Sequence, residues 1–169
     1  MKTLLLLLLS VGLLVSGPAQ ARDVRADASF SGTEHPTQID TNGDMTYASA
    51  GVFEVQGVHG KAVTHTITEF TEFMWYGAPG CDVRALLVSQ EFVEILKDGS
   101  MIFFRATDGY ACVDLTTGEG NGEASGIVIG GTGKFEGATG HWEMTFKPHT
   151  LPSGLNAITG SITGTIELP

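Results

Sequence analysis

The sequence predicts an all-β protein, either a barrel or a sandwich, and three observations lead to this prediction. Residues 155–168 alternate, from Ile158 onward without exception, between apolar or glycine positions and polar positions, which is the period of a β-strand. Asp98-Gly99 lies between two apolar runs and is typical of a tight hairpin turn. The connections are short and rich in glycine, and no segment has the 3.6-residue period of an amphipathic helix.

Eight segments have the alternation and the length of strands. They are residues 26–32, 46–56, 61–71, 83–96, 101–114, 122–129, a segment around 142–146, and 155–168. In the last segment, Gly160 and Gly164 interrupt the apolar face and leave room for a bulky neighbour. We expect the apolar face of the preceding segment to supply this neighbour, from Trp142, Met144 or Phe146.

The segment 83–96 is apolar at both even and odd positions. Uninterrupted alternation places Leu86 and Val88 on the same face as Phe92 and Leu96. If Asp98 and Gly99 are the central residues of the turn that follows, the numbers of residues paired across the hairpin sum to about 197.

Residues 1–21 are typical of a secretory signal peptide. Lys2 supplies the positive charge, residues 4–15 supply a short apolar run, and Ala19-Gln20-Ala21 is a small-x-small cleavage site. The run of about 12 residues is shorter than the roughly 20 that a membrane span needs. We therefore expect cleavage near Arg22, a secreted or periplasmic protein that leaves the membrane after cleavage, and one domain over residues 22–169.

The charge balance of the chain excludes one large class of partners. The 169 residues include 19 acidic residues against 9 Lys and Arg, a formal charge of −10, which becomes −11 once Lys2 is removed. Binding to nucleic acid depends on basic residues that neutralise phosphates, so we expect no nucleic-acid partner.

Cys81 and Cys112 are the two cysteines of the chain. An even count in an exported protein predicts one disulfide between them. The alternatives are a catalytic thiol or a metal pair, although a lone pair of cysteines 31 residues apart does not have the spacing of metal ligands.

Residues 40–44 place oxygen atoms at alternate positions, as the start of a calcium-binding loop does. The twelfth position of such a loop is Gly51 and not a carboxylate, so a turn at Asn42-Gly43 is the simpler interpretation. The sequence therefore predicts neither a metal nor another cofactor.

The most distinctive segment is the glycine-rich run of residues 130–140, which reads as a tight turn with Phe135 as a buried anchor. This run resembles the corresponding turn of the allene oxide cyclase and dirigent-protein barrel superfamily, and residues 158–166 are similar to the last strand of those barrels. The close match covers about the last 40 residues. The strands near the N-terminus do not match in motif, so the catalytic residues of the plant enzymes are not carried over.

The resemblance implies an eight-stranded antiparallel β-barrel with an apolar central cavity, and a homo-oligomer that can be a trimer. Plant members of the superfamily cyclise an unstable fatty-acid epoxide or steer the coupling of phenoxy radicals. Their catalysis is mostly confinement, since the barrel holds a reactive intermediate in one conformation and excludes water.

Four titratable residues on three predicted strands are candidate catalytic groups. His65 and Glu69 share one face of residues 61–71, and they form an acid–base pair in an apolar cavity if that face points inward. If it points outward, both are solvated. Glu91 and Arg105 lie almost opposite each other across the hairpin. They form either an ordinary ion pair on the sheet or a buried anchor for a ligand carboxylate.

Three aromatic residues, Phe92, Phe103 and Trp142, are candidates for the wall of a ligand cavity. Residues 73–76 form an apolar loop just before Cys81, which either packs simply or lies at a cavity rim or a subunit interface.

Two functions follow from these observations. The first is a secreted cyclase- or dirigent-like barrel that binds a small apolar ligand and directs an isomerisation or a cyclisation. The alternative is a non-catalytic secreted barrel for binding or interaction. The barrel interior distinguishes them: a cavity with inward carboxylate, His or Arg groups favours the first, and a solidly packed barrel contradicts it.

Overall fold

The computed structural model describes residues 22–37, 48–71 and 73–169. The expected signal peptide and the Asp40–Asp44 turn lie outside these residues. In the described part of the chain, no helix is both long and apolar enough to cross a membrane.

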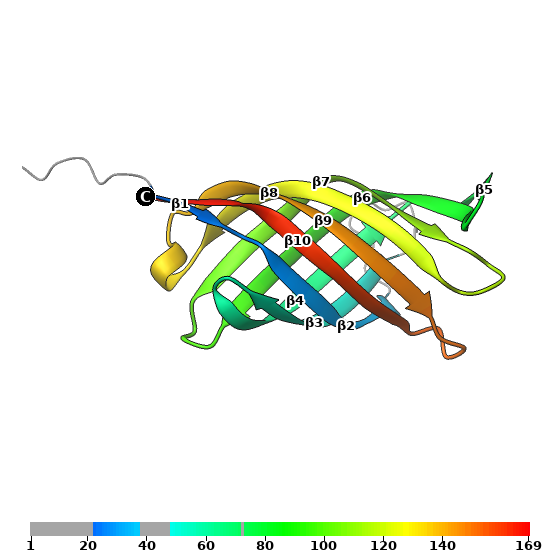
Figure 1. The fold of residues 1–169 in the computed structure, drawn as a ribbon, viewed down its shortest axis with the longest axis horizontal. Coiled ribbons are helices and arrows are strands. Elements are labelled where there is room, and N and C mark those ends of the chain that lie inside the picture. The colour runs from blue at the N-terminus through cyan, green and yellow to red at the C-terminus, as the bar shows by residue number, and fades with distance from the viewer. Residues whose placement is uncertain (1–21, 38–47, 72) are drawn as a thin grey trace, which may run out of the picture.

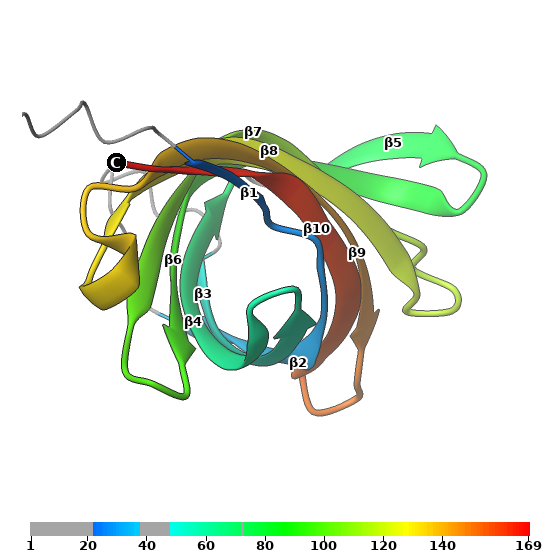
Figure 2. The same ribbon diagram turned by 60° about the vertical axis from the view of Figure 1, so that its left-hand side comes forward.

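The described residues fold into one sheet of ten strands, with one short 3-10 turn, η1 (Figure 1). The elements are β1 (Arg22–Arg25), β2 (Ala28–Thr37), β3 (Ala48–Gly57), β4 (Gly60–Phe70), β5 (Met74–Ala78), β6 (Cys81–Leu96), β7 (Met101–Val113), β8 (Gly120–Gly131), η1 (Gly133–Phe135), β9 (Thr139–Thr150) and β10 (Asn156–Leu168). Eight of the strands form a closed antiparallel barrel in the order β10-β2-β3-β4-β6-β7-β8-β9, and β9 closes it by pairing with β10. Figure 2 looks obliquely into this barrel.

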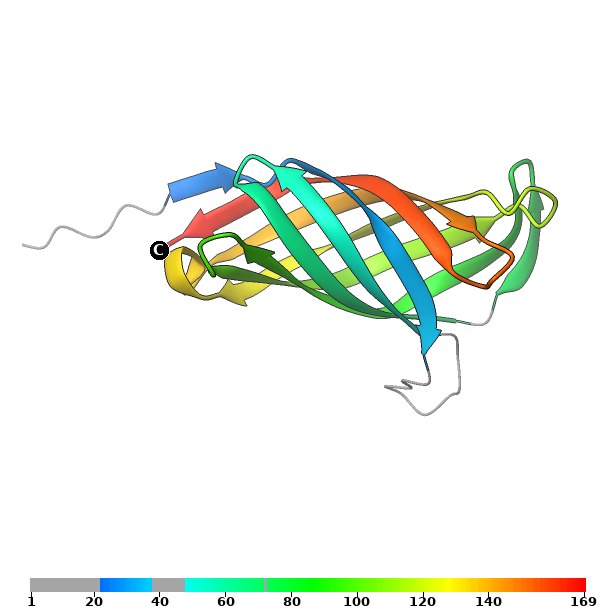
Figure 3. The same ribbon diagram turned by 90° about the horizontal axis from the view of Figure 1, so that it is seen from below.

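The prediction of an eight-stranded antiparallel barrel is confirmed, and each of the eight predicted segments overlaps a barrel strand. Two further strands were not predicted. The short β1 pairs with the end of β10, and β5 pairs with the start of β6 as an arm outside the barrel. Figure 3 shows β1, η1 and the C-terminus at one end of the barrel and the β5 arm at the other.

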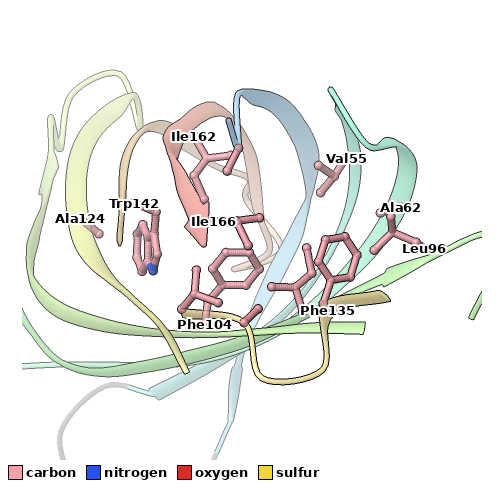
Figure 4. Close-up of a cluster of buried hydrophobic side chains, with 13 residues drawn as sticks. Val55, Ala62, Leu96, Phe104, Ala124, Phe135, Trp142, Ile162 and Ile166 are labelled. Carbon is pink, nitrogen blue, oxygen red and sulfur yellow. The ribbon is translucent and has the colours of Figure 1, made fainter. Parts of the chain in front are cut away.

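The end of the barrel near η1 is filled by apolar side chains. Phe135, carried by η1, is only 1% exposed and joins a core with Trp142, Phe104 and Ile166 (Figure 4). The prediction that Phe135 is a buried anchor is therefore confirmed. A second, smaller cluster around Phe70 lies towards the other end.

Aromatic rings cover strand glycines, as predicted, but with different partners. A Cβ on Gly160 would lie 2.4 Å from the ring of Phe30 on β2, and a Cβ on Gly126 would lie 2.7 Å from the ring of Trp142. Gly164 instead faces the backbone and Cβ of Trp142, whose ring extends towards β8.

A β-bulge at Val88 contradicts the predicted faces of β6. Glu69 pairs with Ser89, whereas the next residue, Phe70, pairs with Leu87, so Val88 is an extra residue in β6. One extra residue exchanges the faces of the positions on either side of it. As a result, odd-numbered residues face inward before the bulge and even-numbered residues face inward after it, and Leu86 and Val88 are exposed whereas Phe92 and Leu96 are not.

The predicted disulfide between Cys81 and Cys112 is present, with a Cα–Cα separation of 5.1 Å. Cys112 lies opposite Arg84 in the β6–β7 ladder, so the bond runs diagonally between these strands. Cys81 pairs with Ala78 next to the turn between β5 and β6, so the bond joins the turn end of the β5 arm to β7.

Candidate functional site

A cavity lies inside the barrel between the two apolar clusters, with about 60 Å³ of free space. This space corresponds to roughly four to six water molecules. Its wall is mostly aromatic and aliphatic, with a few polar groups. The lining residues are Phe30, Glu34, Phe53, Val55, Thr64, Thr66, Thr68, Phe70, Gln90, Phe92, Glu94, Met144, Phe146, Ile158 and Ile162.

Glu34 brings one carboxyl to this cavity from β2. The residue is 7% exposed, and burial raises the pKa of its carboxyl because the charged form loses water. The nearby hydroxyls of Thr68 and Ser49 act in the opposite direction. Thr68 Oγ1 donates a hydrogen bond of 3.3 Å to Glu34 Oε1, whereas Ser49 Oγ is close but not aligned for one.

Glu94 brings a second carboxyl from β6. It follows the bulge at Val88, so its even-numbered position faces the interior. Burial raises the pKa of Glu94 to about 6, and no opposing interaction offsets it. A pKa of about 6 lies close to neutral pH, which is the range that suits a general acid or base.

A chain of hydrogen bonds connects the polar wall. Gln90 Nε2 donates to Thr68 Oγ1 over 3.0 Å, and Thr68 Oγ1 donates onward to Glu34 Oε1. Thr66 Oγ1 lies 3.2 Å from Thr68 Oγ1. The residues come from β2, β4 and β6, so the chain spans one side of the barrel interior.

Sequence reasoning missed Glu34, Gln90 and Glu94. One signal for this polar interior was present in residues 61–71, where Thr64, Thr66 and Thr68 alternate with Val63, His65 and Ile67. The threonines are buried and the other three residues are exposed. The more polar face of this strand therefore points inward, and a pattern of hydrophobicity alone indicates the opposite.

His65 and Glu69 do not lie together in the cavity. His65 is exposed on the outer surface of the barrel, whereas Glu69 is 1% exposed and accepts a hydrogen bond of 3.2 Å from Ser89 Oγ. Neither residue lines the cavity. The two residues therefore do not share a site, and their catalytic roles stay predictions.

Glu91 and Arg105 are directly opposite in the β6–β7 ladder and form an ion pair of 2.8 Å. Both side chains are more than half exposed on the outside of the barrel. The structure therefore agrees with the ordinary surface ion pair, and a buried anchor for a carboxylate at this position is wrong.

The three candidate aromatic residues lie in different places. Phe92 lines the cavity, and Trp142 is buried in the core with its ring centroid 5.1 Å from that of Phe92. Phe103 lies on the outside of the barrel, in a shallow groove beside Glu91 and His65. Only Phe92 belongs to the wall of the cavity.

The predicted apolar loop of residues 73–76 is mostly the strand β5. Met74, Trp75 and Tyr76 are exposed, because β5 pairs only with β6 and carries these side chains away from the barrel. Simple packing, the commoner alternative for this segment, is therefore wrong for these three residues. Arg84 lies 5.3 Å from the ring centre of Tyr76 and 4.2 Å from that of Tyr110, which holds the arm in place.

Fold and site together define a closed antiparallel barrel with a small aromatic cavity that contains two carboxyl groups. Among the described residues, no group of three or more His, Cys, Asp or Glu side chains gathers as metal ligands do. The barrel is the fold that the resemblance of residues 130–140 and 158–166 implied.

The chain is similar in structure to a solved dirigent protein. No family model matches the chain, and no curated protein matches it. The solved structure of the pterocarpan synthase dirigent protein GePTS1 is similar, with a TM-score of 0.48 and 10% sequence identity over 90% of this chain and 88% of that chain. At this level of similarity, nothing follows about the molecule that the present chain binds.

Proposed function

We propose that this protein is a secreted barrel that binds one small, largely apolar molecule in its interior cavity. The observation that carries the proposal is the placement of Glu34 and Glu94 in an aromatic wall beside free space. Burial of ionisable groups lowers stability, and perturbed carboxyls in cavities are typical of functional sites. A barrel that served only as a scaffold would gain stability from apolar residues at these positions.

The proposed activity is to direct an isomerisation or a cyclisation of the bound molecule. The cavity wall limits the conformations that the molecule adopts, and exclusion of water protects a reactive intermediate. Glu94, with a pKa of about 6, supplies a carboxyl that gives or takes a proton near neutral pH. The alternative is a binding barrel without catalysis, which uses the same cavity and the same contacts.

Export is part of the proposal. It is supported by the signal-peptide pattern of residues 1–21 and by the Cys81–Cys112 disulfide, since disulfides persist in oxidising compartments. Self-association is a further part. It is supported by a group of apolar side chains on the outer surface of β4, β7 and β8, which we call the outer apolar face: Val63, Ile67, Phe103, Ile127 and Ile129. The exposed Glu91–Arg105 ion pair lies between Ile67 and Ile127 of this face.

Native mass spectrometry of the protein purified from its source tests ligand binding directly. We expect an extra mass that leaves on unfolding. The variant Thr66→Leu, which fills the cavity, should lose this mass, whereas Thr163→Leu on the exposed side of β10 should keep it. The same extra mass in Thr66→Leu would contradict binding in the cavity. Conversion of the released molecule by fresh protein then distinguishes catalysis from binding.

A further inference from the structure

Apart from the hydroxyl of Thr64 and the second amide hydrogen of Gln90, the polar groups of the cavity offer a ligand hydrogen-bond acceptors. Thr68 has one hydroxyl hydrogen, and it is used on Glu34 Oε1. The contact between Thr66 and Thr68 therefore has Thr66 as its donor, so that hydrogen is used as well. Gln90 gives a hydrogen of its amide to Thr68, while its Oε1 is buried and without a partner.

Glu94 leaves more acceptor capacity unused. Within the part of the chain that the structure describes, its carboxyl makes no hydrogen bond and no ion pair. Desolvation is the only influence on its pKa. A buried carboxyl without a partner is costly, and a ligand that donates hydrogen bonds to it removes that cost.

The cavity also contains no positive charge. None of its lining residues is Lys, Arg or His, although two of them are Glu. The chain as a whole carries a formal charge of −10, so its field attracts cations and repels anions. The aromatic rings of Phe30, Phe53 and Phe92 surround the same space, and aromatic faces attract cations.

We propose that the ligand of this cavity is a small protonated amine, whose ammonium group donates to Glu94, Glu34 or Gln90 and whose apolar part lies against the aromatic wall. This inference rests on the proposed function, because it requires that the interior binds a small molecule. An ammonium group has three donors and no acceptor, which complements a wall of free acceptors. A hydroxyl group satisfies fewer acceptors and brings no charge, and a carboxylate group meets like charge.

The size of the free space limits the amine. About 60 Å³ accommodates a molecule of roughly five non-hydrogen atoms without movement of the wall. We therefore choose n-butylamine as the probe, with 1-butanol and butyrate as matched molecules that differ in the polar group. Binding is followed at neutral pH by NMR titration of the methyl signals of Met144, Ile158 and Ile162, which line the cavity.

We expect n-butylamine to shift these signals with a Kd at least tenfold lower than that of 1-butanol, and butyrate to leave them unchanged. Glu94→Gln should weaken n-butylamine binding at least tenfold and change 1-butanol binding less than twofold. The control is Glu54→Gln, because Glu54 is exposed on the outside of β3 and its replacement should have no effect.

Equal or tighter binding of 1-butanol to the wild-type protein overturns the inference about the amine and leaves the proposed small-molecule cavity intact. So does undiminished n-butylamine binding by a folded Glu94→Gln variant. If none of the three molecules shifts the cavity methyl signals, the inference and the proposed function both fail. The comparison of the three molecules on the wild-type protein decides these outcomes even if a variant does not fold.

Discussion

Thr68 and Glu34 form a hydrogen bond across an intervening strand. They lie on β4 and β2, and β3 passes between them. The residue of β3 that pairs with Glu34 is Gly51, where a Cβ would lie 2.9 Å from Glu34 Cγ and 2.6 Å from the ring of Phe53. The absence of a side chain at Gly51 therefore makes room for the carboxyl and for the contact.

Gly51→Ala should disturb this arrangement. The added methyl group forces Glu34 and the ring of Phe53 to move, and overpacking of this kind costs about 1–3 kcal/mol of the free energy of unfolding. Chemical denaturation measures the change. The control is Ala50→Gly, next to it on β3, which should cost about 1 kcal/mol or less. A Gly51→Ala variant as stable as the wild type would show that the cavity wall accommodates a methyl group at this position.

Stability should fall as the pH rises from about 4.5 to about 6. The pKa of Glu94 is raised from 4.5 to about 6 in the folded protein, so the unfolded chain loses this proton first. The folded state then holds more protons, and rising pH favours unfolding. Glu94 contributes about 2 kcal/mol to this change, and Glu34 acts in the same direction.

Denaturation of Glu94→Gln at pH 4.5 and pH 7 checks this prediction. The variant should be more stable than the wild type at pH 7 by up to about 2 kcal/mol, and the difference should shrink at pH 4.5. The lowered pKa values of Asp98 and Asp114 have the opposite effect on the free energy of unfolding, and this effect occurs at lower pH. A difference that stays constant with pH would show that Glu94 is not desolvated.

Loss of the disulfide should destabilise the protein without removing the barrel. The bond joins residues 31 positions apart, and its replacement by Cys81→Ala with Cys112→Ala should cost about 3–4 kcal/mol by chain entropy. Far-ultraviolet circular dichroism should keep its strand signal, because the β6–β7 ladder continues well beyond the bond. Loss of that signal at low temperature would mean that the bond is required for folding.

The ion pair of Glu91 and Arg105 should matter little. A double-mutant cycle with Glu91→Gln and Arg105→Gln should give a coupling energy of about 0.2–1 kcal/mol, since the pair is exposed. Neither change should affect ligand binding in the cavity. A large loss of binding in Arg105→Gln would instead connect this pair to the interior.

The outer apolar face should control self-association. Ile129→Lys introduces a charge at an exposed position of that face and should shift the protein towards monomers, as measured by light scattering after size-exclusion chromatography. Thr163→Lys, on the exposed side of β10, is the matched control. A monomeric wild-type protein at high concentration would contradict the proposed association.

Much of the fold was predictable from local patterns. The alternation of residues 156–168 and the turn at Asp98-Gly99 depend on backbone geometry that neighbouring residues determine. The numbers of residues paired across the hairpin sum to 196, whereas the sequence predicted about 197. The difference arises because the turn is closed by a hydrogen bond from Leu96 N–H to the carbonyl of Ser100, which leaves three residues in the turn. The disulfide was predictable because only two cysteines are present.

The site was not predictable in the same way, because it depends on which face of each strand points inward. Period-two alternation separates two faces, but closure of the barrel decides which one is interior. His65 is therefore outside although its strand lines the cavity. Gln90 and Glu94 face inward only because Val88 is bulged, and nothing in the run of apolar residues around Val88 marks a bulge.

The bulge at Val88 divides β6 into two parts in which opposite faces of the strand point inward. After residue 88, either the odd-numbered or the even-numbered side chains of β6 could face the interior. The bulge in the backbone decides which set does. If β6 were straight, Val93 and Ile95 would face inward, and Gln90 and Glu94 would face the solvent. The polarity of the interior therefore depends on where the backbone bulge lies as much as on which side chains β6 carries.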